Sequence, residues 1–323
     1  MNVEKLSLGI QKPTGKTNLG EETVALLAAG ELSWKWTEER RDFGPTNLEG
    51  LEIVFMRNGD LVPECVRGDV DLVVTGRDKL WNYDYPNQLI EVANLGISPC
   101  NVDLCVRQDF PYTKLEDLNN RTIATSYPKG TKRWFNKQGI KVKTIPYEGG
   151  EETSVARGKA VACVVVAASG KTIRDNELQT VATLIQSEAL MLANSDLKNR
   201  GNQTQKVAWN FFRMLVTGLW STQYVMVDAN LPLLDDATLA SLPCAKSPTI
   251  SNLQSGGIAT KLMIPRNNLQ EARLKIYQTG GEELGQYDIK RLPNLDEPQV
   301  TALMRAIWPE WELPTPPWSY LIT

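Results

Sequence analysis

Short apolar runs alternate with polar turns and helix-compatible segments along much of this chain. The clearest run extends from Val161 to Val166, where every side chain is β-branched or small. Such a run predicts a strand that is buried on both faces of a parallel sheet. It stops at a small turn rich in hydrogen-bond donors, made of Ser169, Gly170, Lys171 and Thr172.

This turn has the order expected of an anion site, because a buried strand leads through it into a helix-compatible segment. Unpaired backbone N–H groups and the positive end of a helix dipole favour a phosphate at such a position. The alternative is an ordinary strand-to-helix turn in which Ser169 or Thr172 caps the helix. The turn is not a P-loop, because Val165 stands where that motif requires its first glycine. Gly15-Lys16-Thr17 fails as well, since five residues rather than four separate it from Gly9.

The remaining pattern predicts two sets of strands and helices. The first set has strands over 5–10, 53–56 and 69–74 and a helix over 21–29. The second set has strands over 101–106, 123–126, 141–145 and 162–166 and helices over 129–138 and 177–186. A strand over 189–193 would return to the first set. Alternating strands and helices predict two α/β lobes with mainly parallel sheets and a ligand in the cleft between them.

The character of the chain changes near Tyr224. Strands over 224–227 and 257–264 and helices over 234–241 and 268–279 predict a small α+β domain of βαβ-like form. The segment from Trp308 to Trp318 carries three tryptophans and four prolines, which favours an extended, packed arm or a partner-binding segment. The predicted divisions are lobe I over 1–105 plus 195–222, lobe II over 106–194, a regulatory-like domain over 223–295 and a Pro/Trp-rich tail over 296–323.

The composition narrows the possible functions. The 323 residues are 42% hydrophobic and 23% charged, with a net charge of −3, so a globular protein with a substantial core is expected. Lysine and arginine are scattered, which argues against nucleic-acid and membrane-surface partners. The longest apolar run, Ala160 to Ala168, is far too short to span a membrane, and the N-terminus lacks a basic, apolar signal. A cytoplasmic protein is therefore predicted.

The chain contains no histidine. This excludes Ser-His-Asp and Cys-His nucleophiles and His-ligated metal sites. Catalysis would have to use carboxylates, Lys or Arg, hydroxyls, backbone amides or bound Mg²⁺, which suits phosphate binding and charge stabilisation. The odd set of cysteines lacks metal-ligand spacing, so buried free thiols are expected at Cys65, Cys100, Cys105, Cys163 and Cys244.

Taken in order, these segments resemble the long form of ATP phosphoribosyltransferase, the enzyme family that begins histidine biosynthesis. The resemblance covers roughly Leu6 to Leu292. It rests on Gln11 to Lys16, Arg57 with Asp60, Asp71 to Asp78, Ile123 to Pro128, Gly149 with Glu152, Ser169 to Thr172, Tyr224 to Asp228 and Leu242-Pro243 through Ser247-Pro248-Thr249. Each piece alone is weak, but the ordered set is specific.

The resemblance implies a fold of two lobes like periplasmic binding proteins, followed by a small regulatory domain that binds histidine as feedback inhibitor. The implied reaction joins N1 of ATP to C1 of phosphoribosyl pyrophosphate and releases pyrophosphate with Mg²⁺. It also implies a homo-oligomer, a dimer or a hexamer. The partners would be a phosphorylated sugar, a nucleotide and an amino-acid effector.

The resemblance also assigns roles to individual residues. The turn from Ser169 to Thr172 would hold the ribose 5′-phosphate. The catalytic candidates are Lys12 and Lys16, near the pyrophosphate, and Glu152, which would contact a hydroxyl. The candidates for binding the other substrate are Arg57, Asp78, Thr125 and Ser126. No residue is assigned to bind a metal. Structural roles stay open for several of these: Arg57 with Asp60 as a surface pair, Asp78 as a helix cap, and Thr125 with Ser126 as a helix start.

The chain departs from the family at the strand before the phosphate turn. Relatives carry two aspartates there, and this chain has Val161 and Val165. Valine cannot accept a hydrogen bond from a ribose hydroxyl, and the loss of a buried acceptor costs about 1–3 kcal/mol. Glu148 or Glu151, in the glycine-rich segment beside Glu152, is a candidate to replace the missing carboxylate. Three hypotheses follow: an ATP phosphoribosyltransferase with a tolerant sugar site, a repurposed paralogue in specialised metabolism with another donor or acceptor, and a non-catalytic ligand-binding or regulatory subunit.

Overall fold

The structure is a computed structural model. It describes residues 5–14, 19–34, 42–84, 87–167, 171–232, 239–245, 248–254, 256–289 and 298–313. The chain divides into two compact units. The first comprises Met1–Val24, Trp34–Val207 and Leu303–Trp311, and the second comprises Ala25–Ser33, Ala208–Ala302 and Glu312–Thr323. The expectation of a mixed α/β chain is confirmed.

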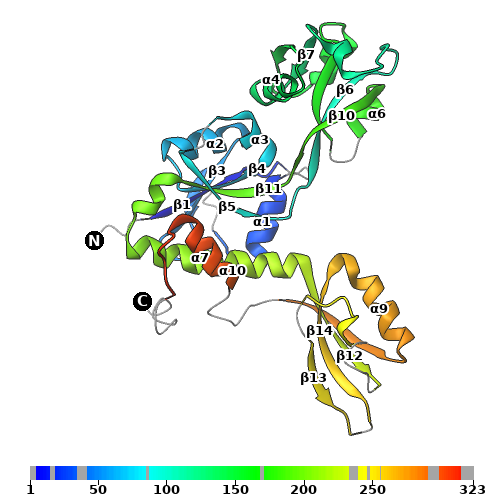
Figure 1. Cartoon of the computed structure of the whole chain (residues 1–323). Helices are drawn as coiled ribbons and strands as arrows, with labels where there is room; N and C mark the ends of the chain where they lie inside the picture. The colour runs from blue at the N-terminus through cyan, green and yellow to red at the C-terminus, as the bar shows by residue number, and fades with distance from the viewer. Residues whose placement is uncertain are drawn as a thin grey trace. The chain divides into compact units, whose positions relative to one another are not determined.

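The first unit contains two lobes, each built on its own sheet (Figure 1). The sheet of lobe I has the order β2-β3-β1-β4-β11-β5. Its strands are β1 (Leu6–Gln11), β2 (Phe43–Pro45), β3 (Leu51–Met56), β4 (Leu72–Gly76), β5 (Leu89–Asn94) and β11 (Ala189–Asn194). Strands β3, β1 and β4 are parallel, whereas β2, β11 and β5 each pair antiparallel with their neighbours. The sheet is therefore mixed, with a parallel group of three strands.

The sheet of lobe II has the order β10-β6-β9-β7-β8. Its strands are β6 (Cys100–Arg107), β7 (Thr122–Thr125), β8 (Lys143–Pro146), β9 (Ala162–Ala167) and β10 (Leu178–Ser187). The predicted helix over 177–186 is wrong, because this segment is β10 and pairs antiparallel with β6. Val181 and Ile185 are β-branched, as are two threonines in the segment, and such residues favour a strand where a neighbour is available to pair.

The helices of the first unit lie against these sheets. They are α2 (Asn58–Arg67), α3 (Arg77–Asn82), α4 (Pro128–Lys137), α5 (Glu151–Ala156) and α6 (Lys171–Asp175), whereas α1 (Leu19–Ala29) begins in the first unit and ends in the second. Helix α2 contacts β4, β1 and β11, whereas α5 contacts β9, β7 and β6. The longer helix α7 (Asn202–Gln223) runs from the first unit into the second, and α10 (Pro298–Ile307) spans the same division.

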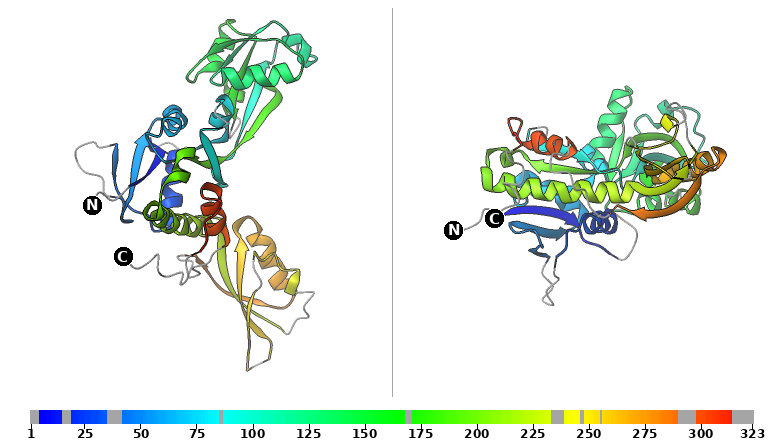
Figure 2. Two further views of the ribbon diagram at one scale, coloured as in Figure 1. Left: turned by 60° about the vertical axis from the view of Figure 1, so that its left-hand side comes forward. Right: turned by 90° about the horizontal axis from the view of Figure 1, so that it is seen from below.

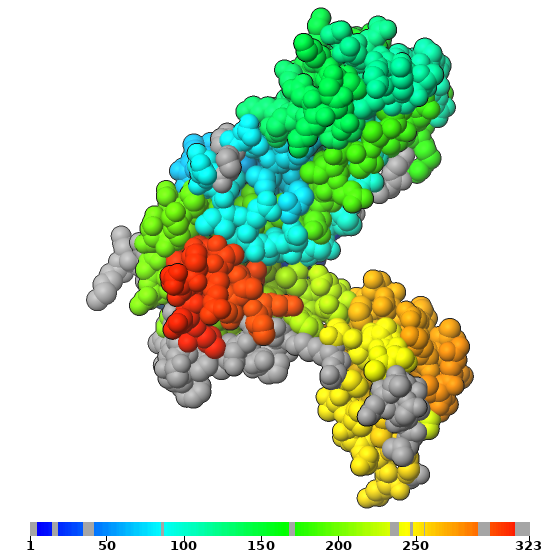
Figure 3. Space-filling model, in the orientation of Figure 1, coloured from blue at the N-terminus to red at the C-terminus, as the bar shows by residue number. Residues whose placement is uncertain are grey.

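The chain passes between the lobes twice, from β5 to β6 and from β10 back to β11 (Figure 2). The two connections lie side by side, since Cys100 at the start of β6 pairs with Ser187 at the end of β10. The return strand predicted over 189–193 is confirmed as β11, which enters the sheet of lobe I between β4 and β5. The space-filling view shows the two lobes in direct contact (Figure 3).

Lobe II has a hydrophobic core on each face of its sheet. Ile123 and Val164 face one core with Phe135 of α4, whereas Cys163 and Val165 face the other with Val155 of α5. The expectation of a strand buried on both faces of a parallel sheet is met only in part, because β9 is parallel to β7 but antiparallel to β6, and Val166, near its end, is 44% exposed. The five cysteines are free thiols, of which Cys65, Cys105 and Cys163 are buried and Cys100 and Cys244 are partly buried.

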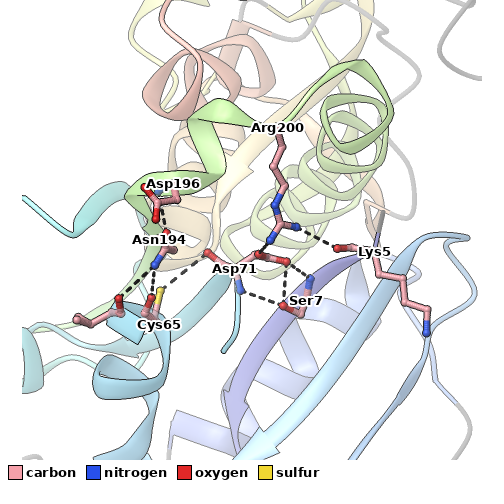
Figure 4. Close-up of polar contacts among 8 residues, drawn as sticks. Lys5, Ser7, Cys65, Asp71, Asn194, Asp196 and Arg200 are labelled. Carbon is pink, nitrogen blue, oxygen red and sulfur yellow. Dashed lines mark hydrogen bonds and ion pairs between the residues drawn. The ribbon is translucent and has the colours of Figure 1, made fainter. Parts of the chain in front are cut away.

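A buried aspartate ties three segments of lobe I together at the beginning of β4 (Figure 4). The backbone N–H and the hydroxyl of Ser7, on β1, donate to one carboxylate oxygen of Asp71 at 2.8 and 2.9 Å. Arg200, beyond the end of β11, donates to the other oxygen. The Asp71 carbonyl accepts from the backbone N–H of Asn194 at 2.8 Å. Asp71 is therefore a structural residue that fixes where the returning chain joins the sheet.

The second unit contains an antiparallel sheet of order β13-β14-β12-β15. Its elements are β12 (Tyr224–Leu231), β13 (Thr249–Asn252), β14 (Ile258–Pro265), α9 (Leu269–Gln278) and β15 (Glu282–Asp288). Strands β14 and β15 both flank β12 and are joined through α9, which is a split βαβ unit, so the small α+β domain is confirmed. Most of the helix predicted over 234–241 lies outside the described residues, as does Trp318 of the tail. Among the described helices, none combines the length and apolar character that a membrane span requires.

Candidate functional site

A cavity of about 710 Å³ lies between the lobes of the first unit. Lobe I contributes residues from the start of α2 and from α3, and lobe II contributes residues from the ends of β7, β8 and β9 and from α5 and α6. Strands β7, β8 and β9 are parallel, so their carboxyl ends meet at one edge of the sheet. That edge is where α/β folds bind ligands.

The wall from lobe I is cationic and polar. Arg57 precedes α2 directly, and its backbone has extended geometry, with φ −71° and ψ 146°. Lys79 lies on α3, and both cations line the cavity together with Asn58, Asp60, Asn82 and Tyr83. An anionic ligand would therefore meet its counter-charges on lobe I.

The wall from lobe II carries carboxylates and hydroxyls. Glu148, Glu151 and Glu152 follow β8, and all three line the cavity. Glu151 is buried, with 7% of its surface exposed, and accepts a hydrogen bond from the hydroxyl of Ser126. Tyr147 and Thr172 add hydroxyl groups, and Val165 and Val166 form the apolar part of this wall.

A chain of hydrogen bonds joins the lobes beside the cavity. The Tyr127 hydroxyl, in lobe II, donates to the carboxylate of Asp78 in lobe I at 2.6 Å. The Ser187 hydroxyl donates to the other Asp78 oxygen at 2.8 Å. Lys79 lies 3.2 Å from the Tyr127 oxygen and 4.6 Å from the centre of its ring. Burial, and then the negative charge of Asp78, raises the pKa of Tyr127, so its phenol stays a proton donor.

Helix α3 also docks on the first turn of α4. The side chain of Asn82 accepts hydrogen bonds from the backbone N–H groups of Lys129 and Gly130 at 3.0 and 3.2 Å. Gly130 lies against the ring of Trp81, and a Cβ atom at that glycine would come within 2.6 Å of the ring. Arg133 donates to the carbonyl of Trp81. This contact fixes α4 to lobe I next to the cavity.

The structure places four of the predicted site residues in the lining of one cavity: Arg57, Ser126, Glu152 and Thr172. Lys12 lies elsewhere, in an exposed ion pair of 2.5 Å with Asp42. Asp78 is held by Tyr127 and Ser187 and does not line the cavity. Lys16, Ser169 and Gly170 lie outside the described residues, and Lys171 is described only as the first residue of α6.

Thr125 is fully buried and has a structural role in the turn before α4. Its hydroxyl accepts a hydrogen bond from the Tyr127 N–H at 2.9 Å and lies 3.1 Å from the hydroxyl of Thr131. The alternative of a helix start therefore describes Thr125, whereas Ser126 reaches the cavity.

Sequence reasoning missed several residues of the cavity. Lys79 follows the predicted Asp78 directly, and Tyr127 follows the predicted Ser126. Asn82 is the last residue of α3, a helix of six residues, and Tyr83 follows it directly. The adjacency of Lys79 and Tyr127 to predicted residues was a usable signal, whereas nothing in the sequence indicated that α3 would reach across to α4.

The carboxylates do not form a preassembled metal cage. In the described part of the chain, no three Asp, Glu or Cys side chains are grouped closely enough to hold a metal ion. Mg²⁺ typically takes one or two protein carboxylates together with substrate phosphates and water.

Comparisons with known proteins agree with this architecture. The family model of ATP phosphoribosyltransferase matches residues 57–213. Over this range the chain is similar to the ATP phosphoribosyltransferase family. The matched range includes every residue of the cavity lining, from Arg57 to Thr172.

Curated relatives in the ATP phosphoribosyltransferase family cover most of the chain. The enzyme of Bacteroides thetaiotaomicron is 29% identical over 270 residues, which is 83% of this chain and 93% of the relative. That of Trichlorobacter lovleyi is 27% identical over 285 residues, covering 86% of this chain and 96% of the relative. These lengths show that the likeness extends beyond the two lobes into the small domain.

A solved structure shares the fold. A chain of the ATP phosphoribosyl transferase (HisG:HisZ) complex from Thermotoga maritima superposes with a TM-score of 0.55 at 19% identity. The alignment covers 66% of this chain and 98% of that chain. The shared fold therefore accounts for about two thirds of the present chain, and the remainder has no counterpart in that matched chain.

Proposed function

We propose that this protein transfers a phosphoribosyl group from phosphoribosyl pyrophosphate to N1 of ATP, with release of pyrophosphate, in the cavity between the lobes. The observation that carries the proposal is that the family match, 57–213, contains the entire lining of that cavity. The cavity volume of about 710 Å³ lies within the range typical of small-molecule sites.

The residues suit a reaction that separates charge. The bond between C1 of the ribose and the pyrophosphate oxygen breaks, and the pyrophosphate leaves with the electron pair. The lone pair of adenine N1 forms the new bond to C1, and the adenine then loses a proton from its amino group. Arg57 and Lys79 would face the phosphates, where fixed cations stabilise the negative charge of the leaving group.

The carboxylates of lobe II would stabilise the positive charge that develops on the sugar. Positive charge develops on the ribose as pyrophosphate leaves, and the carboxylates Glu151 and Glu152 come from lobe II, whereas the cations come from lobe I. No residue needs to act as a strong general base, which fits a chain without histidine. When bound with the donor, Mg²⁺ would neutralise pyrophosphate charge, and the carboxylates available to it are those of Asp60, Glu148 and Glu152.

The roles proposed for the remaining predicted residues follow the family resemblance. The turn from Ser169 to Thr172 would hold the 5′-phosphate, with Thr172 already at the cavity. By the same resemblance Lys16 would act near the pyrophosphate, and so would Lys12, which would have to leave its exposed pair with Asp42 to do so. For Asp78 we propose an indirect role, because Tyr127 and Ser187 occupy its carboxylate and it therefore positions the joint between the lobes.

The family resemblance supports two further proposals, one about regulation and one about assembly. We propose that the small domain of β12 to β15 is regulatory and binds free histidine as an effector. We also propose that the chain forms a homo-oligomer, a dimer or a hexamer.

Val161 and Val165, where relatives carry aspartates, favour a second candidate function, in which the same cavity uses another donor or acceptor. Val165 lines the cavity and offers no hydrogen-bond acceptor to a sugar, whereas Val161 precedes β9 and does not line the cavity. A relative repurposed for specialised metabolism would retain the phosphate-binding features and differ at such contacts.

Titration calorimetry with phosphoribosyl pyrophosphate and Mg²⁺, followed by a pyrophosphate-release assay with ATP, tests the proposal. Binding of the donor and release that depends on ATP would support it. Donor binding without ATP-dependent release would favour the second candidate. Absence of donor binding by the folded protein would overturn phosphoribosyl transfer.

A further inference from the structure

The inference concerns Glu151 and rests on the proposed function. A cavity that selects a ribose must present acceptors to its hydroxyl groups, because an unpaired buried hydroxyl weakens binding. Strand β9 presents only Val165 and Val166 to the cavity. The acceptors must therefore come from another element.

The segment after β8 supplies three carboxylates, and their surroundings differ. Glu148 is exposed and Glu152 is half-buried, whereas Glu151 is 7% exposed. The hydroxyl of Ser126, at the end of β7, donates to Oε1 of Glu151. Glu151 is thus the one carboxylate of this wall that combines burial with a fixed position among the described residues.

Glu151 lies where it can supply the hydrogen-bond acceptor that Val165 cannot. Val165, on β9, and Ser126, which follows β7, lie on neighbouring parallel strands, since Thr125 pairs with Val164. Glu151, Ser126 and Val165 line the same cavity. A carboxylate held there is desolvated, so a hydrogen bond from a ligand hydroxyl to it is strong.

A second buried carboxylate near Val165 is less suited to this task. Asp103 lies directly opposite Val165 in the antiparallel pair of β6 and β9. It does not line the cavity, and its Oδ1 already accepts a hydrogen bond from the Thr183 hydroxyl at 2.7 Å. Asp103 is therefore a suitable control for Glu151, because it is a buried carboxylate near Val165 that does not reach the cavity.

We propose that Glu151, positioned by Ser126, accepts a hydrogen bond from a ribose hydroxyl of the phosphorylated sugar and so selects ribose over deoxyribose. Glu151 is the contact residue, and Ser126 is a positioning residue that orients it. The carboxylate that β9 lacks is in this way supplied from α5.

The test compares calorimetric binding of ribose 5-phosphate with that of its 2-deoxy and 3-deoxy analogues, without any need for turnover. The wild-type protein should bind ribose 5-phosphate about 10- to 100-fold more tightly than at least one analogue. Glu151→Met keeps the length of the side chain and removes its oxygens, so it should reduce that preference to about 3-fold or less. Glu151→Gln retains one acceptor oxygen and should keep part of the preference.

Three further variants sharpen the comparison. Ser126→Ala leaves the carboxylate but frees it, so the preference should fall less than in Glu151→Met. Glu116→Gln removes the same charge from an exposed site on lobe II and should leave the preference unchanged. Asp103→Asn should also leave it unchanged. Thermal unfolding of each variant establishes that it is folded, and Glu151→Gln and Ser126→Ala keep the test decisive if Glu151→Met does not fold.

The outcomes separate this inference from the proposed function. Binding of ribose 5-phosphate with a preference that survives in Glu151→Met, or that is lost in Asp103→Asn instead, would overturn the role of Glu151 and leave phosphoribosyl binding intact. Equal binding of ribose 5-phosphate and both analogues by the wild-type protein would have the same meaning. Failure of the wild-type protein to bind either ribose 5-phosphate or phosphoribosyl pyrophosphate would overturn the proposed function itself.

Discussion

The side-chain oxygen of Asn82 lies 3.0 Å from the backbone nitrogen of Lys129, so a residue of lobe I caps a helix of lobe II. Helix α4 has no capping hydrogen bond from its own N-cap residue, Tyr127. The cap is instead supplied across the joint between the lobes. Stability of α4 and contact between the lobes are therefore coupled through one amide.

Replacing Asn82 with alanine tests this coupling. Loss of a helix cap costs about 1 kcal/mol, which corresponds to a fall of roughly 2–4 °C in the melting temperature of a domain of this size. Differential scanning calorimetry measures the change. Asn87→Ala, at an exposed position of the same lobe, is the matched control and should melt like the wild-type protein. Equal melting temperatures for the two variants would contradict the cap.

Lys79 should matter for binding more than for folding. It lines the cavity, where Arg57 is the other described cation. Because a charged hydrogen bond to a phosphate contributes more than a neutral one, Lys79→Met should weaken binding of phosphoribosyl pyrophosphate about 10-fold or more. Calorimetric titration gives the dissociation constant. Lys137→Met, on the exposed side of α4, should bind as the wild-type protein does, and equal affinities for the two variants would argue against a phosphate beside Lys79.

Arg200 should be important for stability, because it is paired with a buried carboxylate. Arg200→Met would leave Asp71 with the hydrogen bonds from Ser7 alone. Removing one partner of a largely buried pair is expected to lower the free energy of unfolding by roughly 2–4 kcal/mol. Urea denaturation measures this value. Arg67→Met breaks an exposed pair with Asp69 and should have no measurable effect, and similar losses in both variants would contradict the role of burial.

The buried thiols predict how stability depends on pH. Burial, and then the charge of Asp71, raises the pKa of Cys65 to about 12, and burial raises the pKa of Cys105 to about 11. An unfolded cysteine titrates near about pH 8.5, so above that pH the unfolded chain loses protons that the folded chain keeps. The free energy of unfolding should therefore fall as pH rises above about 8.5, by up to ~1.4 kcal/mol per pH unit for each such thiol.

Urea denaturation of the wild-type protein and of Cys65→Ala between about pH 7 and pH 10 measures this dependence. The variant should lose less stability over the alkaline half of the range, because one of the titrating thiols is absent. Parallel curves for the two proteins would show that Cys65 keeps its ordinary pKa in the folded state.

The lobed α/β architecture was predictable because the periodicity of each strand, and the order in which strands and helices follow one another along the chain, can be read locally from the sequence. The segment over 177–186 was assigned wrongly, since its apolar residues fit helix and strand periods about equally well and the partner that decides, β6, lies far away in the sequence. Helix α2 was missed because Gly59 and Pro63 have poor helix propensity. Here tertiary contacts with β1 and β4 outweigh propensity.

The candidate site was predictable in part. Arg57 and Ser126 lie next to strand ends that the pattern identified, so their place at the cavity follows from the topology. Asp78 has the same kind of position, but a partner from the other lobe, Tyr127, occupies its carboxylate. Contacts of this kind depend on how the lobes meet, which a linear pattern does not contain. The same reason explains why the capping role of Asn82 had no signal in the sequence.

Because the buried thiols have raised pKa values, their rates of chemical labelling can measure local opening of the protein. A buried, protonated thiol does not react with alkylating reagents, so the rate of labelling measures how often its surroundings open. Cys65 lies in the core of lobe I, whereas Cys105 and Cys163 lie together in the core of lobe II. Mass spectrometry of the labelled peptides would therefore time the opening of each lobe separately in one unmodified sample.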